Sequence, residues 1–281
     1  MASQKMIPLS FEFFPPRDAA GRDKLTAGTA EKLATLNPEY FSVTYGAGGS
    51  TKAGTRQTIT DLTKRGWNAV PHLSVGGNDL QGTLELVAYY KELGIKKILC
   101  LRGDQAASDS HNSQYAEDLV RLIRQHFGDS FEIIVGAYPE VHPDSATSRD
   151  DLMFFKRKVD AGADVAITQY FYNVEAYAYF VQHSQRLGID IPIVPGIMPI
   201  TNYASLCRFS EKAGADIPRW LDRAMAQRQA SNDDLNKFGV EVVTRLCEQL
   251  IELGAPALHF YTLNRWGATT KVCANLGQNV S

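Results

Sequence analysis

The sequence predicts an α/β protein, a (β/α)8 TIM barrel that forms a single domain over residues 1–281 with an insertion before the eighth strand. Eight short runs rich in β-branched and aromatic residues alternate with longer segments of helical apolar spacing. Most runs begin about 25–35 residues apart, which is the size of a βαβ unit. Eight such units favour a closed parallel barrel over an open sheet, and the first turn, residues 13–17, lacks the glycines of a dinucleotide-binding sheet.

The predicted strands are spread along the whole chain. In order they are Ser10–Phe14, Tyr40–Tyr45, Val70–Ser74, Lys97–Leu101, Phe131–Tyr138, Val165–Phe171, Ile193–Gly196 and Ala257–Tyr261. Apolar residues three or four positions apart predict the helices between them, for example Leu80, Leu84 and Val87. Glycines such as Gly94 and Gly162 are typical of helix C-caps and mark turns from helix into strand.

The segment between the seventh and eighth strands is longer than the others. It contains a helix at Asn202–Ala213, a connector around Pro218 and Trp220, and a helix near Asp233–Leu253. We interpret it as an insertion within the seventh unit.

Composition excludes several classes of protein. Hydrophobic residues make up 44% of the chain, and a net charge of -2 argues against a nucleic-acid partner. No apolar run approaches the roughly 18 residues of a membrane span, and the first residues lack a signal-peptide layout. The four cysteines lie far apart with no CxxC pair, which favours a reduced, cytoplasmic protein.

A barrel enzyme has its active site where its strands end. Polar residues lie at or just beyond the ends of seven of the eight predicted strands: Glu12, Thr44, His72, Arg102 with Asp104, Tyr138 with Glu140 and His142, Gln169, and residues 262–265. These positions predict one wide polar mouth.

Glu12 is the sharpest of these candidates. Strand alternation puts it opposite Phe11 and Phe13, so it faces either the barrel lumen or the helices. Burial would favour its neutral form, which suits a general acid near neutral pH. A buried, paired structural glutamate explains the same residues equally well.

Other candidates also have two interpretations. Arg102-Gly103-Asp104 could hold a phosphate or form a surface ion pair in a turn. The loop 138–143 could present His142 rigidly or hold a structural histidine, and His72 is equally ambiguous. Residues 156–158, Lys-Arg-Lys, could meet an anion or form a solvated helix face. Without HxxH or HExxH spacing, no metal site is expected.

Eight sequence blocks resemble the signature blocks of bacterial 5,10-methylenetetrahydrofolate reductases. In the same order, they are residues 11–17, 42–47, 71–73, 101–104, 137–143, 156–162, 167–169 and 260–265. The resemblance implies a homo-oligomeric FAD flavoprotein on a (β/α)8 barrel. In that family NADH or NADPH reduces the flavin and leaves. Methylenetetrahydrofolate then binds the same face and becomes 5-methyltetrahydrofolate, a ping-pong sequence.

The resemblance also implies residue roles. Glu12 would protonate the nitrogen that leaves when the folate ring opens, and Asp104 would lie between flavin and pterin. FAD would contact Thr44, Tyr45, Ala47, His72, Arg102, Gly103, Asp104, Ala116, Tyr138, His142, Asp151, Arg157 and Lys158. The substrates would contact Gln169, Phe209 and Arg265.

Two positions depart from the family pattern. Ser205 stands where a relative has a longer amide that contacts folate, and Phe154 stands where a polar residue lines the flavin site. Two alternative functions stay open: a pterin-dependent methyltransferase barrel without flavin, and a non-catalytic folate- or flavin-binding barrel in which Glu12 is structural.

Overall fold

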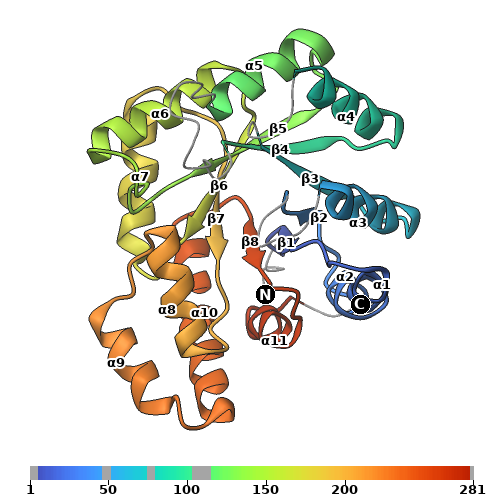
Figure 1. Ribbon diagram of the computed structural model, residues 1–281. Helices are drawn as coiled ribbons and strands as arrows, with labels where there is room; N and C mark the ends of the chain where they lie inside the picture. Colours follow the sequence, from blue (N-terminus) through green and yellow to red (C-terminus); the bar gives the residue numbers. More distant parts are fainter. Residues whose placement is uncertain (1–5, 46–51, 75–79, 103–114, 279–281) are drawn as a thin grey trace.

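The centre of the molecule is a closed barrel of eight parallel strands in chain order (Figure 1). The computed structural model describes residues 6–45, 52–74, 80–102 and 115–278. The strands are β1 (Leu9–Phe13), β2 (Tyr40–Val43), β3 (Ala69–Ser74), β4 (Lys97–Leu101), β5 (Glu132–Ala137), β6 (Val165–Tyr170), β7 (Ile193–Ile197) and β8 (Leu258–Tyr261). β8 pairs with β1, with Ser10 opposite His259 and Glu12 opposite Tyr261, and this pairing closes the barrel. The predicted fold class is therefore confirmed.

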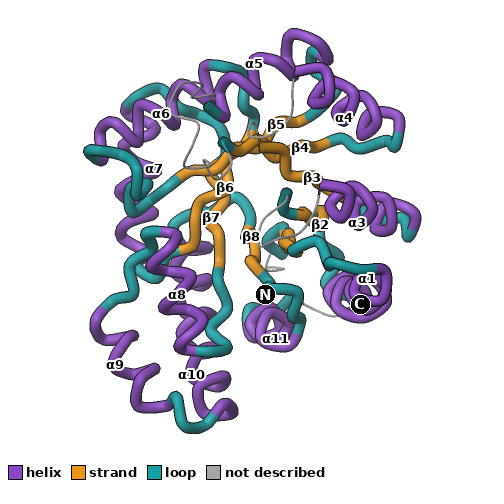
Figure 2. The backbone as a smooth tube through the Cα atoms, viewed as in Figure 1, coloured by secondary structure: helices purple, strands orange, loops and turns teal. Residues whose placement is uncertain are grey.

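Helices form an outer ring around the strands, as Figure 2 shows. They are α1 (Ala19–Lys24), the π-helical η1 (Leu25–Ala30), α2 (Glu31–Ala34), α3 (Lys52–Lys64), α4 (Leu80–Glu92), α5 (Ala116–Phe127), α6 (Ser148–Asp160), α7 (Val174–Arg186), α8 (Tyr203–Ala213), α9 (Arg219–Arg228), α10 (Asn232–Glu252) and α11 (Gly267–Asn275). Each of the eight strands is followed by at least one helix, as the alternating pattern predicts.

The insertion before β8 differs from the prediction in one respect. The segment after Pro218, which we expected to be a connector, is the helix α9. Proline suits the start of a helix because its missing N–H would have no intrahelical partner there. Leu221 and Met225 lie four residues apart and are fully buried, which gives this short helix an apolar face. Figure 1 shows α9 at the periphery, beside α8 and α10.

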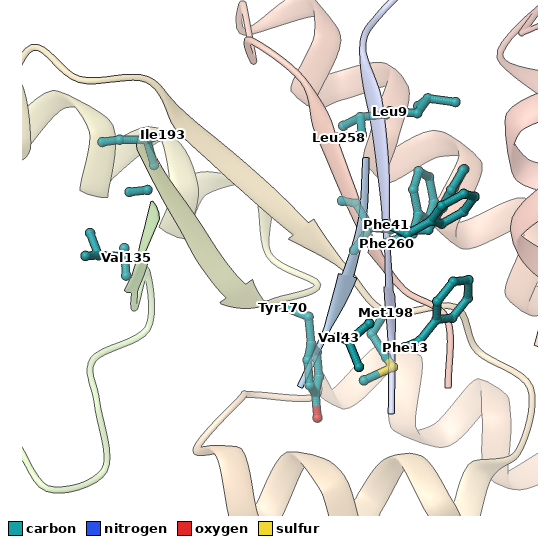
Figure 3. Close-up of a cluster of buried hydrophobic side chains, with 14 of the residues drawn as sticks. Leu9, Phe13, Phe41, Val43, Val135, Tyr170, Ile193, Met198, Leu258 and Phe260 are labelled. Atoms are coloured by element: carbon teal, nitrogen blue, oxygen red, sulfur yellow. The ribbon is translucent and has the colours of Figure 1, made fainter. Parts of the chain in front are cut away.

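An outer apolar layer lies between the strands and the helices. Figure 3 shows part of it, including the aromatic rings of Phe13, Phe41 and Phe260. The ring centroids of Phe13 and Phe41 lie 5.3 Å apart, and Phe11 packs on Phe41 and Phe260 at 6.1 and 5.9 Å. Phe11 and Phe13 therefore face the helices.

An inner apolar layer fills the barrel lumen. It contains one residue from each of six successive strands: Tyr40, Val70, Leu99, Ile134, Ile167 and Val194. Side chains alternate between the two faces of a strand, so Glu12 faces away from its neighbours Phe11 and Phe13. Glu12 consequently points into the lumen, one of the two directions that the sequence left open.

Candidate active site

Glu12 lies in the lumen between two imidazole rings. Its Oε2 atom is 3.5 Å from Nε2 of His72 on β3 and 3.5 Å from Nε2 of His259 on β8. The Glu12 side chain is 12% exposed, whereas those of His72 and His259 are 4% and 0% exposed. The carboxyl group thus retains a narrow access to the mouth of the barrel while its partners are enclosed.

A serine orients the second of these imidazoles. Nδ1 of His259 forms a 2.8 Å hydrogen bond with Oγ of Ser10, which is also buried. Ser10 and Glu12 are two residues apart on β1, so both face the lumen. The hydrogen bonds therefore form a chain from Ser10 through His259 to Glu12.

His72 is held in its neutral form. Burial lowers its pKa to about 4, although the nearby charge of Glu12 partly opposes this shift. Neither ring nitrogen has a hydrogen-bond partner among the described residues. Two other buried polar atoms, Oγ of Ser42 on the neighbouring strand β2 and Oγ1 of Thr44 directly after it, also lack partners among the described residues. Buried polar groups are usually satisfied, so this sector of the lumen and mouth is suited to a polar ligand.

The turn after β8 is tied to the end of β1 beside Glu12. Oγ1 of Thr262 donates to the carbonyl oxygen of Glu12 at 2.6 Å. The Asn264 side chain accepts from N–H of Phe14 and donates to its carbonyl oxygen, both at 2.9 Å. These bonds fix the backbone from which the Glu12 side chain projects.

A second polar cluster lies where β4 and β5 end. The guanidinium of Arg102 donates to the carboxylate of Asp144, and this bond lowers the pKa of Asp144. Nδ1 of His142 accepts from the N–H of Asp144 at 3.0 Å, and the His142 ring packs against Tyr138 at 4.5 Å between centroids. Burial, together with Arg102, lowers the pKa of His142, so its ring is neutral near pH 7.

Lys158 brings a cation to the same cluster. Its Nζ donates to the carbonyl oxygen of Gly136 on β5 at 2.6 Å, and burial lowers its pKa to about 8. The charges of Asp151 and Arg102 act on this lysine in opposite directions. Asp151 is buried and accepts from Oγ of Ser145 at 3.0 Å. Arg102, Asp151 and Lys158 all lie close enough to His142 for their charges to act on its ring, so the structure brings these four candidates together.

The remaining candidates take varied positions. Thr44 is buried, Tyr45 is half-buried, and Ala116 is the buried first residue of α5. Gln169 is half-buried on β6, and its Oε1 accepts from the N–H of Tyr170. Phe209 is 39% exposed on α8, and Ser205 precedes it by one turn. Arg265 and Arg157 are exposed. Ala47, Gly103 and Asp104 lie outside the described residues.

Phe154, the second departure from the family pattern, belongs to an aromatic stack. Its ring lies 6.2 Å from that of Tyr115 at an angle of 13°, and the guanidinium of Arg157 lies 5.1 Å from the ring centre. The guanidinium of Arg157, in the last turn of α6, is thereby held over an aromatic face.

Sequence reasoning missed several residues of the lumen. The missed residues are Ser10, Ser42, His259 and Tyr261. Ser10 is on the same strand face as Glu12, Ser42 and Tyr261 lie opposite Glu12 on the neighbouring strands, and His259 lies opposite Ser10. The hydroxyl of Tyr261 donates to the carbonyl oxygen of Thr168 on β6 at 2.7 Å. Alternation along β8 could have identified His259 and Tyr261 as a lumen pair.

The described residues contain neither a metal-binding cluster nor a membrane-spanning helix. No group of three or more His, Cys, Asp or Glu side chains in the described ranges is arranged to hold a metal ion. Within the same ranges, no helix combines the length and the hydropathy that crossing a membrane requires.

Known proteins resemble this chain over almost its full length. A family model described as "Methylenetetrahydrofolate reductase" matches residues 1–277. The 5,10-methylenetetrahydrofolate reductase of Pectobacterium carotovorum is 36% identical over 275 residues, which covers 98% of this chain and 91% of that protein. The Escherichia coli protein of the same name is 35% identical, with 98% and 92% covered.

Solved structures share the fold at lower identity. A Clostridium thermocellum protein described as binding two copies of 5-methyl-5,6,7,8-tetrahydrofolic acid superposes with a TM-score of 0.66 at 16% identity, covering 97% of this chain and 95% of that one. A 2,3-dimethylmalate lyase superposes with a TM-score of 0.53 at 12% identity, covering 97% and 79%. The full-length family match and the bacterial relatives confirm the resemblance seen in the sequence blocks: this chain belongs to the methylenetetrahydrofolate reductase family.

Proposed function

We propose that this protein reduces 5,10-methylenetetrahydrofolate to 5-methyltetrahydrofolate, with FAD as cofactor and NADH or NADPH as reductant in a ping-pong sequence. The observation that carries the proposal is the position of Glu12, in the lumen of a barrel of this family and between two enclosed imidazoles. The names of the bacterial relatives supply the substrate.

Glu12 would act as the general acid. Reduction of the methylene carbon requires its bond to one ring nitrogen to break, and that nitrogen leaves more easily when it receives a proton. His72 is neutral near pH 7, so it forms no ion pair that would hold Glu12 as a carboxylate. The hydrogen bond between His259 and Glu12 fixes the direction of the carboxyl group.

The residues around the mouth fit a flavin dinucleotide. Oγ1 of Thr44 is a buried polar atom without a partner among the described residues, and the cations of Arg102 and Lys158 lie at the ends of β4 and β5. These cations would neutralise the pyrophosphate, with Arg157 and the start of α5 at Ala116 nearby. Asp151 could accept from a ribose hydroxyl. Bound flavin would supply the hydride.

Substrate contacts would come from the opposite side of the mouth. Gln169 on β6 would meet folate and nicotinamide in turn, Phe209 would pack on a bound ring, and Arg265 would pair with a carboxylate. Asp104 would accept from the pterin edge. Homo-oligomeric assembly, which the family resemblance implies, and a cytoplasmic location, which the cysteine pattern favours, belong to the same proposal.

Anaerobic absorbance spectroscopy tests the proposal. The purified protein should show flavin absorbance that NADH or NADPH bleaches and methylenetetrahydrofolate restores. Glu12→Gln should slow the folate half-reaction by about 10²–10⁴-fold and leave flavin reduction nearly unchanged. Glu132→Gln, a carboxylate at the opposite end of the barrel paired with Lys97, is the control and should affect neither step.

The outcomes separate the alternatives. Methyl transfer without flavin would establish the methyltransferase alternative. Ligand binding without turnover in wild-type protein would establish a binding protein. Equal slowing of both half-reactions by Glu12→Gln would reject the acid role while leaving the reductase function intact.

A further inference from the structure

The loop after β5 is fastened to the segment between α8 and α9. Oε2 of Glu140 accepts from the backbone N–H of Asp216 at 2.8 Å, a contact between residues 76 positions apart. Burial raises the pKa of Glu140 to about 6, so near neutral pH it is an ionised acceptor. Hydrogen bonds to ionised acceptors are stronger than neutral ones.

Backbone strain lies beside this contact. Val141 has φ of +72°, in the left-handed region that β-branched residues rarely adopt. His142, whose ring belongs to the second polar cluster, is the next residue. Such outliers persist only where their surroundings hold them, and they concentrate at ligand-binding sites.

The loop has a second attachment at the end of α8. Gly214 caps this helix with φ of +67°, and a Cβ atom there would lie 2.5 Å from Cγ of Pro143. The ring of Pro143 therefore packs directly on the helix end. Oγ of Ser210, on the last turn of α8, also forms a 3.0 Å hydrogen bond with the hydroxyl of Tyr170 on β6. The same helix carries Phe209.

The geometry points to a clasp, formed by Glu140 with Asp216 and by Pro143 with Gly214, that holds the β5 loop in its strained conformation. We propose that Glu140 is a positioning residue: through this clasp, α8 with Phe209 and the loop with His142 order one another. This inference rests on the proposed function in assigning flavin to the His142 side and folate to the Phe209 side. It predicts that loss of the clasp weakens binding at both.

A purely local role predicts a different result. If Glu140 only satisfies one N–H in an exposed connector, its removal should loosen residues near Asp216 and leave the β5 loop unchanged. Amide hydrogen exchange distinguishes the two without any assay of activity.

The exchange experiment compares Glu140→Ala, Glu140→Gln and a matched control. Glu140→Ala removes the acceptor and should accelerate exchange in peptides covering both 138–145 and 203–216. Glu140→Gln keeps a carbonyl acceptor but loses the charge, so it should accelerate exchange in both peptides less than Glu140→Ala does. Glu132→Ala, which removes a carboxylate at the start of the same strand, should change neither. Acceleration confined to 203–216 would overturn the clasp.

A titration with FAD tests the consequence for binding. Glu140→Ala should weaken FAD binding by about 3- to 10-fold, and Glu140→Gln should weaken it less. Glycine adopts a positive φ without strain, so adding Val141→Gly to Glu140→Ala should recover part of the loss. Unchanged FAD affinity in Glu140→Ala would overturn the inference. Failure of the wild-type protein to bind FAD would instead overturn the proposed function.

Discussion

The side chain of Asn264 pairs with the backbone of Phe14 as another strand residue would. Its amide oxygen accepts from Phe14 N–H and its amide nitrogen donates to the Phe14 carbonyl, both at 2.9 Å. The backbone pairing between β1 and β8 ends at Glu12 and Tyr261, so the Asn264 side chain extends the hydrogen bonding between the two chain segments past the end of this pairing. Leu263 and Asn264 both have positive φ, of +51° and +58°. The turn after β8 adopts a strained backbone, and the hydrogen bonds of Asn264 hold the end of β1 in place.

Asn264→Ala should destabilise the protein by about 2–4 kcal/mol, because two hydrogen bonds are lost and alanine disfavours a positive φ. Asn264→Gly separates the two effects, since glycine adopts this φ freely but lacks the amide. Urea unfolding of both variants measures the difference. Wild-type stability in Asn264→Gly would show that the pairing with Phe14 contributes nothing.

Ser10→Ala tests the hydrogen-bond chain to Glu12. The substitution removes the 2.8 Å partner of His259 and frees that ring to turn away from Glu12. We expect the folate half-reaction to slow by about tenfold while reduction by NADH is unchanged. Stopped-flow absorbance measures both steps. Thr35→Ala, which removes an exposed hydroxyl from the end of α2, is the control. A similar slowing of both steps would mean that Ser10 supports the fold rather than Glu12.

The pH dependence of stability should report on His72. Its pKa is lowered from 6.5 to about 4 in the folded protein, so folding favours the neutral ring. The stabilisation is fully present above pH 6.5 and is lost as the pH falls towards 4, at up to about 1.4 kcal/mol per pH unit. His72→Asn should reduce this slope. Urea unfolding between pH 7 and 4.5 measures it, with exposed His126→Gln as control. An unchanged slope in His72→Asn would contradict the assignment.

Periodicity predicted the barrel because eight units of similar length leave few other ways to bury their apolar faces. Strand ends were predicted to within two residues: Glu12 and His72 lie within the last three residues of β1 and β3, and Arg102 directly follows β4. The error in the insertion has a local cause: α9 is short and contains four charged residues, so its two buried apolar positions gave a weak periodic signal.

Contacts within the site could not be predicted in the same way. Glu12 and His259 are 247 residues apart, and their contact depends on closure between β8 and β1. The left-handed φ of Val141 has no sequence signal, because valine disfavours this region. The sequence pattern predicts which face of a strand or helix a residue occupies. The contact between Glu12 and His259 and the backbone conformation of Val141 depend instead on which strands and helices pack together.

Lys158 should control the pH dependence of FAD binding. Burial lowers its pKa from 10.5 to about 8, so the ammonium that would meet the pyrophosphate is charged at pH 7 and loses its proton above pH 8. FAD affinity should therefore fall as the pH rises from 8 to 9, by at most about tenfold per unit. Lys158→Met should weaken binding at pH 7 by about 10- to 100-fold and flatten this dependence.

Lys156→Met is the matched control for this test. Lys156 lies on the same helix but pairs with Asp160 four residues along, away from β5. Fluorescence quenching of FAD at pH 7, 8 and 9 measures all three proteins. If Lys158→Met bound FAD as tightly as wild type, Lys158 would serve only to satisfy the carbonyl of Gly136, and the anion site would depend on Arg102 and Arg157. If both lysine variants weakened binding equally, the effect would come from the overall charge of α6 rather than from an ammonium held against β5.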